Sequence, residues 1–277
     1  MPRSERFFHL HLISDSTGET LIAVSRAAAA QYANLRAIEH VYPLVRNQEQ
    51  LDDALAEIET APGIILYTLI NRELIDHLNQ HCRDLGLPVV SVLDPVLGVF
   101  RSYLGTETTP RVGGQHVLDR DYFRRIDALN FTMMHDDGQH PEDLEESDVI
   151  LVGISRTSKT PTSIYLANRG IRTANVPIIL NVPPLPELER ATRPLVVGLV
   201  SSAERIMQIR RNRVLSMRAD QGTDYTDRSA ILQELAYMRR LCATHDWPII
   251  DISRRSIEET AASVIAMYQR LRLDRAQ

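Results

Sequence analysis

The chain has 277 residues, of which 44% are hydrophobic and 24% charged, and its formal net charge is −5. These values are typical of a globular protein with about two domains, and they exclude a disordered or collagen-like chain. The negative charge argues against a general polyanion binder, so no nucleic-acid partner is expected. Only two cysteines are present, which excludes a disulfide framework. Neither an apolar run of ~18 residues nor a signal-peptide pattern occurs, which predicts a cytoplasmic protein without membrane association.

The first third of the chain alternates between strands and helices. The pattern predicts strands at 7–13, 38–43, 63–68 and 88–93, and helices at 19–33, 48–60 and 72–85. Strands separated by helices of this length are typical of parallel βαβ units. Ser16 and Glu19 have the spacing of a capping box, which predicts the start of the first helix.

A break in this pattern separates two α/β units. Residues 105–114 contain Thr-Pro and Gly-Gly breaks and are expected to form a connection or a mobile loop, followed by a helix at 119–131 and a polar loop at 135–146. The second unit is predicted to have strands at 148–152, 176–180, 195–200 and 248–252, and helices at 161–168, 203–217, 229–245 and 256–273. We therefore expect an α/β fold with mainly parallel sheets. Its parts are an N-terminal domain over 1–104, a connecting helix and loops over 105–146, and a C-terminal domain with a P-loop-like strand–loop–helix over 147–277.

The distribution of basic residues singles out one position. Of 31 basic residues, Lys159 is the only lysine. Genomic base composition accounts for an excess of arginine, but it does not explain where the one lysine lies. Lys159 belongs to Gly-Ile-Ser-Arg-Thr-Ser-Lys-Thr at 153–160, which differs from the Walker A pattern only because Ser158 stands where that pattern has Gly.

The position of this segment, after a buried strand and before a helix, predicts a phosphate-binding loop. Backbone N–H groups there converge near a helix N-terminus, which favours an anion. Lys159 would neutralise phosphate charge as a compact ammonium, a role for which the planar fork of arginine is poorly suited. Thr160 would offer its hydroxyl to Mg²⁺. The predicted nucleotide-binding residues are Gly153, Ile154, Ser155, Arg156, Thr157, Ser158, Lys159 and Thr160.

Two other interpretations of the same loop stay open. It could be a polar loop that only caps a helix. It also resembles the hydroxyl-rich loop of sugar-phosphate isomerase domains, in which Ser155, Thr157, Ser158 and Thr160 would hold a phosphate without help from Lys159.

Three more clusters are candidates for chemistry. Asp15 follows the first strand and could contact a metal or hydroxyl, with the neighbouring Ser and Thr residues as a second anion site. Alternatively, the segment is only a helix cap made by Ser16 and Glu19. Residues 135–140 (His-Asp-Asp-Gly-Gln-His) have three possible roles. They could bind zinc, or Asp136 or Asp137 could act as a general base or contact Mg²⁺. Alternatively, they form a solvated acidic loop. The basic segment 205–218 could bind phosphate or an acidic partner, or be a solvated helix face, and its candidate contacts are Arg205, Arg210 and Arg213.

Five segments together resemble a known family almost end to end. The chain resembles the pyruvate, phosphate dikinase / phosphoenolpyruvate synthase regulatory protein family at residues 13–20, 115–131, 135–139 and 247–261, and especially at 153–170. Its bacterial members include the variant with Ser before Lys. The resemblance implies a bifunctional enzyme whose ADP-binding loop corresponds to residues 153–160. One activity is an ADP-dependent serine/threonine kinase that inactivates the dikinase at an active-site Thr. The other removes that phosphate with inorganic phosphate as acceptor, releasing pyrophosphate.

The resemblance and the residues together give a working scheme. Lys159 and Thr160 handle the β-phosphate and Mg²⁺, Asp137 or Asp15 positions the accepting hydroxyl or the metal, and arginines of the basic segment balance charge or dock the target. The N-terminal third favours the dikinase as target, with phosphoenolpyruvate synthase as the alternative. A small-molecule kinase and a non-catalytic sugar-phosphate or nucleotide sensor are the other classes considered. A homodimer is compatible with the sequence, which does not itself determine the oligomeric state.

Overall fold

The structure, a computed structural model, describes residues 6–107, 109, 120–217 and 223–275. It consists of two compact units, Met1–Val117 and Leu118–Gln277, each containing one four-stranded sheet in which every strand pair is parallel. The predicted α/β class with parallel sheets is therefore confirmed. Most of the loop expected at 105–114 lies outside the described residues. No helix in the described ranges combines the length and apolar character needed to cross a membrane.

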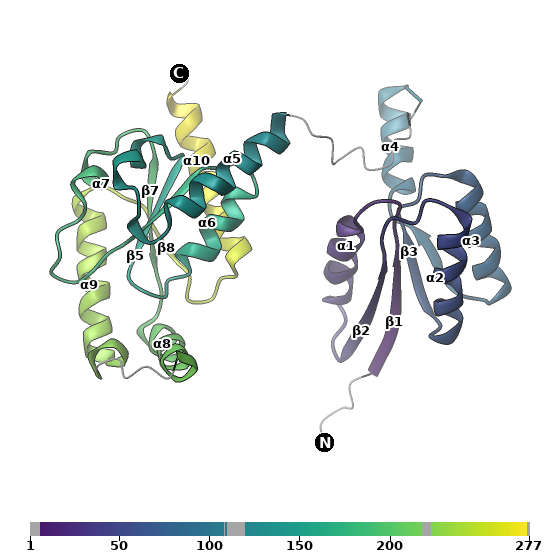
Figure 1. Cartoon of the computed structure of the whole chain (residues 1–277), viewed down its shortest axis with the longest axis horizontal. Helices are drawn as coiled ribbons and strands as arrows, with labels where there is room; N and C mark the ends of the chain where they lie inside the picture. Colours follow the sequence, from purple (N-terminus) through teal and green to yellow (C-terminus); the bar gives the residue numbers. More distant parts are fainter. Residues whose placement is uncertain (1–5, 108, 110–119, 218–222, 276–277) are drawn as a thin grey trace. The chain divides into compact units, whose positions relative to one another are not determined.

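The first unit is a sheet with helices on both faces (Figure 1). Leu10 and Leu12 pack with Leu21 of the first helix on one face, whereas the second and third helices cover the other. The strand order is β2-β1-β3-β4. The elements are β1 (Arg6–Ile13), α1 (Glu19–Ala29), β2 (Leu35–Tyr42), α2 (Gln48–Thr60), β3 (Gly63–Tyr67), α3 (Arg72–Asp84), β4 (Val89–Ser91) and α4 (Asp94–Leu104).

One local expectation in this unit was wrong, and one helix was not predicted. The predicted capping box does not form, because Gly18, at φ 80°, is the N-cap of α1, and the N–H of Ser16 donates instead to Ser14 Oγ at 3.1 Å. Helix α4 was not predicted. It has Pro95 in its first turn and Gly105 as its C-cap. None of its residues is buried, although Val96, Phe100 and Leu104 are apolar residues at helical spacing.

The second unit repeats the strand arrangement of the first, with the order β6-β5-β7-β8. Its central strand β5 is buried on both faces: Ile150 and Val152 belong to the core under α8 and α9, and Val149 and Leu151 to the core under α6 and α10. The elements are α5 (Arg120–Met134), the 3-10 helices η2 (Asp136–Gly138) and η3 (Pro141–Glu146), β5 (Val149–Gly153), α6 (Lys159–Ala167), β6 (Thr173–Pro177), α7 (Pro186–Arg190), β7 (Leu195–Val200), α8 (Ala203–Met217), the 3-10 helix η4 (Thr223–Thr226), α9 (Arg228–Thr244), β8 (Ile249–Asp251) and α10 (Ile257–Arg275).

Two features of this unit position the candidate site. Helix α5 and the turn after it, expected within the connecting segment 105–146, pack against α6 and β6. Strand β6, expected at 176–180, lies three residues earlier, which places Asn175 inside the sheet. In both units the strand order reverses beside the first strand, and ligands of open α/β sheets bind outside the carboxyl ends at such points. The loop after β5 occupies that place in the second unit.

Candidate active site

The loop after β5 is shaped by two residues with special backbone requirements. A Cβ at Gly153 would lie 2.6 Å from Thr157 Oγ1 and 2.8 Å from the carbonyl oxygen of Leu199, so only glycine fits there. Ser158, the N-cap of α6, has φ 55°, in the left-handed region that favours glycine. Ser158 thus adopts the conformation available to the Gly of the Walker A pattern, at a cost of about 1 kcal/mol or more. The hydroxyl of Thr157 donates to the Ile154 carbonyl at 2.9 Å and stabilises the turn.

The Lys159 side chain is buried at the first residue of α6, with 6% of its surface exposed. Its ammonium donates to the Ile154 carbonyl at 3.2 Å. Burial lowers the pKa of Lys159 to about 8, although the negative charges of Asp137 and Asp136 act in the opposite direction. A buried ammonium is costly because the interior solvates it poorly, and a bound anion offsets that cost.

Three polar side chains from separate elements meet beside this lysine. Thr160 Oγ1 donates to the Asp136 carboxylate, at 2.9 Å from Oδ1 and 3.3 Å from Oδ2. Asn175 Nδ2 donates to Thr160 Oγ1 at 3.0 Å and also to Asp136 Oδ1. Within the described part of the chain, the buried Oδ1 of Asn175 has no hydrogen-bond partner. The three residues therefore present carboxylate, hydroxyl and amide oxygens, which are the donors that Mg²⁺ prefers.

These residues line a cavity of about 1000 Å³ in the second unit. Its walls include six residues of the loop and helix start, from Ser155 to Thr160, together with the acidic turn at Asp136 and Asp137. Gly153 and Ile154 do not line the cavity, but they help to shape the loop. Other lining side chains come from α8, η4 and α9, namely Ile209, Arg210, Arg213, Tyr225 and Glu234. The cavity has room for a nucleotide, and its basic groups suit the phosphates of one.

The three arginines singled out from the sequence have different surroundings. Arg210 is 1% exposed, and its guanidinium forms a bidentate pair with Glu234 at 3.0 and 2.6 Å. It also donates to the carbonyls of Ser155 and Tyr225, so it ties the loop to α8 and η4. Arg213 is exposed and lines the cavity. Arg205 donates to the Ser253 carbonyl at 2.6 Å and does not line it.

Asp15 lies in the first unit, in a small cavity of about 270 Å³ that also includes Arg46. Its carboxylate accepts from the N–H of Ile70 at 3.0 Å. Burial raises the pKa of Asp15, while the Ile70 hydrogen bond and the charge of Arg46 oppose that shift. The structure therefore brings Lys159 and Asp137 together in one unit and places Asp15 in the other.

Three polar residues of the cavity were not predicted from the sequence, namely Asn175, Tyr225 and Glu234. Asn175 has a recognisable signal, since an amide within a strand whose neighbours are all buried needs polar partners. The hydroxyls of Tyr225 and Ser155 lie 3.2 Å apart. Nothing in the local sequence around Tyr225 or Glu234 indicates that either reaches the loop, because both come from elements 70 or more residues downstream.

Comparison with known proteins identifies relatives over nearly the whole length. The family model described as kinase/pyrophosphorylase matches residues 10–265. Proteins named as pyruvate, phosphate dikinase regulatory proteins are similar to this chain in Bradyrhizobium diazoefficiens (60% identity over 97% of this chain and 96% of the relative), Chelativorans sp. (63%, 96% and 98%) and Brucella ovis (62%, 97% and 97%). The extent of the model match and these identities show that the chain belongs to the kinase/pyrophosphorylase family.

Proposed function

We propose that the chain is a bifunctional regulator of pyruvate, phosphate dikinase. As an ADP-dependent serine/threonine kinase it phosphorylates an active-site Thr of the dikinase, and with inorganic phosphate it removes that phosphate and releases pyrophosphate. The observation that carries the proposal is the buried ammonium of Lys159 in a cavity shared with Asp136, Asp137 and Thr160. The names of the relatives support the dikinase as target over phosphoenolpyruvate synthase.

In the kinase direction the cavity residues position ADP and neutralise charge. Lys159 and the loop N–H groups hold the β-phosphate, and Arg213, which also lines the cavity, adds positive charge near the phosphates. The bond between the β-phosphorus and its bridging oxygen breaks, a bond to the Thr oxygen of the target forms, and AMP leaves. Asp137, whose charge acts on Lys159, takes the hydroxyl proton.

The reverse activity uses the same groups on a different acceptor. Inorganic phosphate occupies the anion position near Lys159 and attacks the phosphorus of the phosphothreonine. The bond between phosphorus and the Thr oxygen breaks, the Thr oxygen regains a proton from Asp137, and pyrophosphate leaves. One anion-binding loop therefore serves both directions, because each requires phosphate oxygens at the start of α6.

The oxygen donors beside the loop fit a magnesium ion. Asp136, Thr160 and the Oδ1 of Asn175, which has no partner among the described residues, would hold it. When bound, Mg²⁺ supplies charge neutralisation for the phosphate oxygens. Asp136 and Asn175 orient the Thr160 hydroxyl whether or not the ion is present.

A transfer assay tests the proposal directly. The purified chain is incubated with β-³²P-labelled ADP and either purified dikinase or purified phosphoenolpyruvate synthase. Label on a Thr of the dikinase, and its release as pyrophosphate on addition of inorganic phosphate, is the expected result. Label on the synthase alone would contradict the proposed target, and label on neither protein would contradict the kinase activity. Lys159→Ala should abolish labelling, whereas Arg211→Ala, an exposed arginine of α8 that does not line the cavity, should not.

A further inference from the structure

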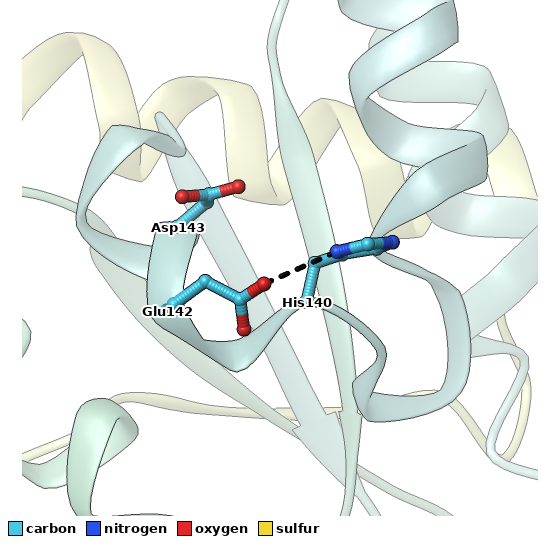
Figure 2. Close-up of side chains that lie close together, drawn as sticks. All are labelled: His140, Glu142 and Asp143. Atoms are coloured by element: carbon cyan, nitrogen blue, oxygen red, sulfur yellow. Dashed lines mark hydrogen bonds and ion pairs between the residues drawn. The ribbon is translucent and has the colours of Figure 1, made fainter.

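The acidic turn between α5 and β5 has two separate sets of contacts. Asp136 contacts Thr160 and Asn175 in the cavity described above. His135 and His140 instead approach two carboxylates of η3. His140 Nδ1 lies 3.2 Å from Glu142 Oε1, and His135 Nε2 lies 3.9 Å from Asp143 Oδ2. Figure 2 shows His140, Glu142 and Asp143 gathered around this short helix.

His135 carries the strongest indication of a missing ligand. Its ring stacks on Phe131, with 3.8 Å between centroids, and only 3% of its surface is exposed. His135 Nδ1 is 2.7 Å from the Phe131 carbonyl oxygen, which only accepts, so the ring proton lies on Nδ1. Nε2 is then an electron pair donor. It is buried and has no hydrogen-bond partner among the described residues, which is unusual for an interior polar atom.

The arrangement matches the way histidines are prepared for metal binding. A metal-ligating histidine almost always donates its other ring N–H to a carbonyl or carboxylate, which fixes the tautomer and the ring orientation. The Phe131 carbonyl has this role for His135. His135 Nε2 and Asp143 Oδ2 are 3.9 Å apart, a separation that lets one cation bind both atoms.

Three further donors lie beside His135. One ligand atom each from His140, Glu142 and Asp143 lie within 4.8 Å of one another, and His135 adjoins this group through Asp143. Ligands around tetrahedral zinc are about 3.4 Å apart, since the bonds are about 2.0–2.1 Å long. His140 and Glu142 are exposed, so small side-chain rotations can close the set around an ion.

We propose that His135, His140, Glu142 and Asp143 bind one zinc-class transition-metal ion. Two imidazoles favour zinc and its neighbours over Mg²⁺ or Ca²⁺, which prefer oxygen donors alone. The ion links the end of α5 to η3 and thereby fixes the turn that carries Asp136 and Asp137. It is separate from the magnesium proposed at Thr160, and the proposal does not depend on the kinase activity.

A zinc titration tests the site. The purified full chain, freed of metal with a chelator, is titrated with Zn²⁺ by calorimetry in excess Mg²⁺ and without nucleotide. One zinc per chain is expected. His140→Ala and Asp143→Asn should each weaken zinc binding at least tenfold. His77→Ala is the matched control, because His77 is also partly exposed and lies 2.7 Å from a carboxylate, that of Asp52, but belongs to no group of three such donors among the described residues.

Substitution of the metal separates the site from weaker explanations. Co²⁺ should give the intense visible absorption of tetrahedral coordination, and His135→Gln, confirmed as folded by circular dichroism, should lose it. If His135→Gln does not fold, Asp143→Asn provides the same readout. Absence of zinc binding, or binding unchanged in both His140→Ala and Asp143→Asn, would overturn the proposal. Equal weakening in His77→Ala would overturn it too, as adventitious binding.

Discussion

The hydroxyl of Thr160 donates a hydrogen bond to the carboxylate of Asp136 at 2.9 Å, across 24 residues of sequence. Asn175, from a third element, donates to both residues. The first residues of α6 are therefore joined to the acidic turn and to β6. A substitution that removes one of the three side chains therefore removes hydrogen bonds that orient the other two.

Asn175→Ala tests this arrangement. The substitution removes the hydrogen-bond donor to Thr160 and Asp136, and it removes an amide oxygen from the proposed Mg²⁺ site. The phosphoryl-transfer rate should therefore fall about 10- to 100-fold, and the Mg²⁺ concentration that gives half the maximal rate should rise. The measurement is the transfer rate as a function of Mg²⁺ concentration. Asn168→Ala is the control, because Asn168 caps the far end of α6 and donates only to the Ile164 carbonyl in the described structure. An unchanged Mg²⁺ dependence in Asn175→Ala would show that Asn175 does not support the ion.

Lys159→Arg tests whether a compact ammonium is required. The Arg fork is larger and its charge is spread over a plane, so it does not replace a point charge buried beside the loop. We expect at least about a hundredfold loss of transfer in both directions with the fold retained, where about a hundredfold corresponds to about 2.7 kcal/mol. The reverse exchange on the surface, Arg211→Lys, should have no effect. Normal activity of Lys159→Arg would mean that the single lysine reflects composition only.

ADP affinity should depend on pH through Lys159. Burial lowers the pKa of its ammonium to about 8, opposed by Asp137 and Asp136 and assisted by Arg156 and Arg210. Phosphate groups are fully ionised above about pH 7, since their second pKa is near 6. ADP binding should therefore be nearly constant from pH 7 to 7.5 and weaken toward tenfold per unit above pH 8, as the free protein loses the ammonium. Calorimetric titrations across this range measure the effect, and Lys159→Ala should show no such decline.

The same pKa has a consequence for stability with the opposite sign. In the unfolded chain Lys159 has its ordinary pKa of 10.5, above the folded value. The unfolded state therefore binds more protons between pH 8 and 10.5, and this group's contribution to the free energy of unfolding rises with pH in that window. Comparison with Lys159→Met by urea unfolding at pH 7.5 and 9.5 isolates the contribution. If the free energy of unfolding rose less from pH 7.5 to pH 9.5 in the wild type than in Lys159→Met, this expectation would be contradicted.

Arg210 should act on stability and Arg213 on activity. Removing one partner of a buried ion pair leaves the other charge uncompensated, so Arg210→Met and Glu234→Gln should each lower the free energy of unfolding by about 3 kcal/mol. Arg213→Met, on an exposed residue, should change it by less than about 0.5 kcal/mol but weaken ADP binding. Urea unfolding and ADP titration of the three variants provide the measurements. A stable Arg210→Met protein would argue that Arg210 is available to phosphate.

The local pattern predicted the repeating part of the fold well. Apolar runs and amphipathic stretches gave α2 at its observed bounds and most other elements within a few residues, because burial on a sheet face or helix stripe imposes a period on the sequence. Helix α4 was not predicted, although Val96, Phe100 and Leu104 give its sequence apolar residues at helical spacing. The capping box at Ser16 was wrong because Gly18 takes the left-handed position at the N-cap.

The sequence by itself determined the α/β class and the strand–loop–helix around the one lysine, since both depend on residues close together in the chain. Only the tertiary structure decided that Asp136 and Asn175 meet Thr160, that Arg210 is paired with Glu234, and that Asp15 belongs to the other unit. Those relationships depend on which strands lie side by side and in which register. Parallel pairing of β5 with β6 sets Leu151 opposite Asn175 and so fixes where that amide lies, a constraint that no local pattern encodes.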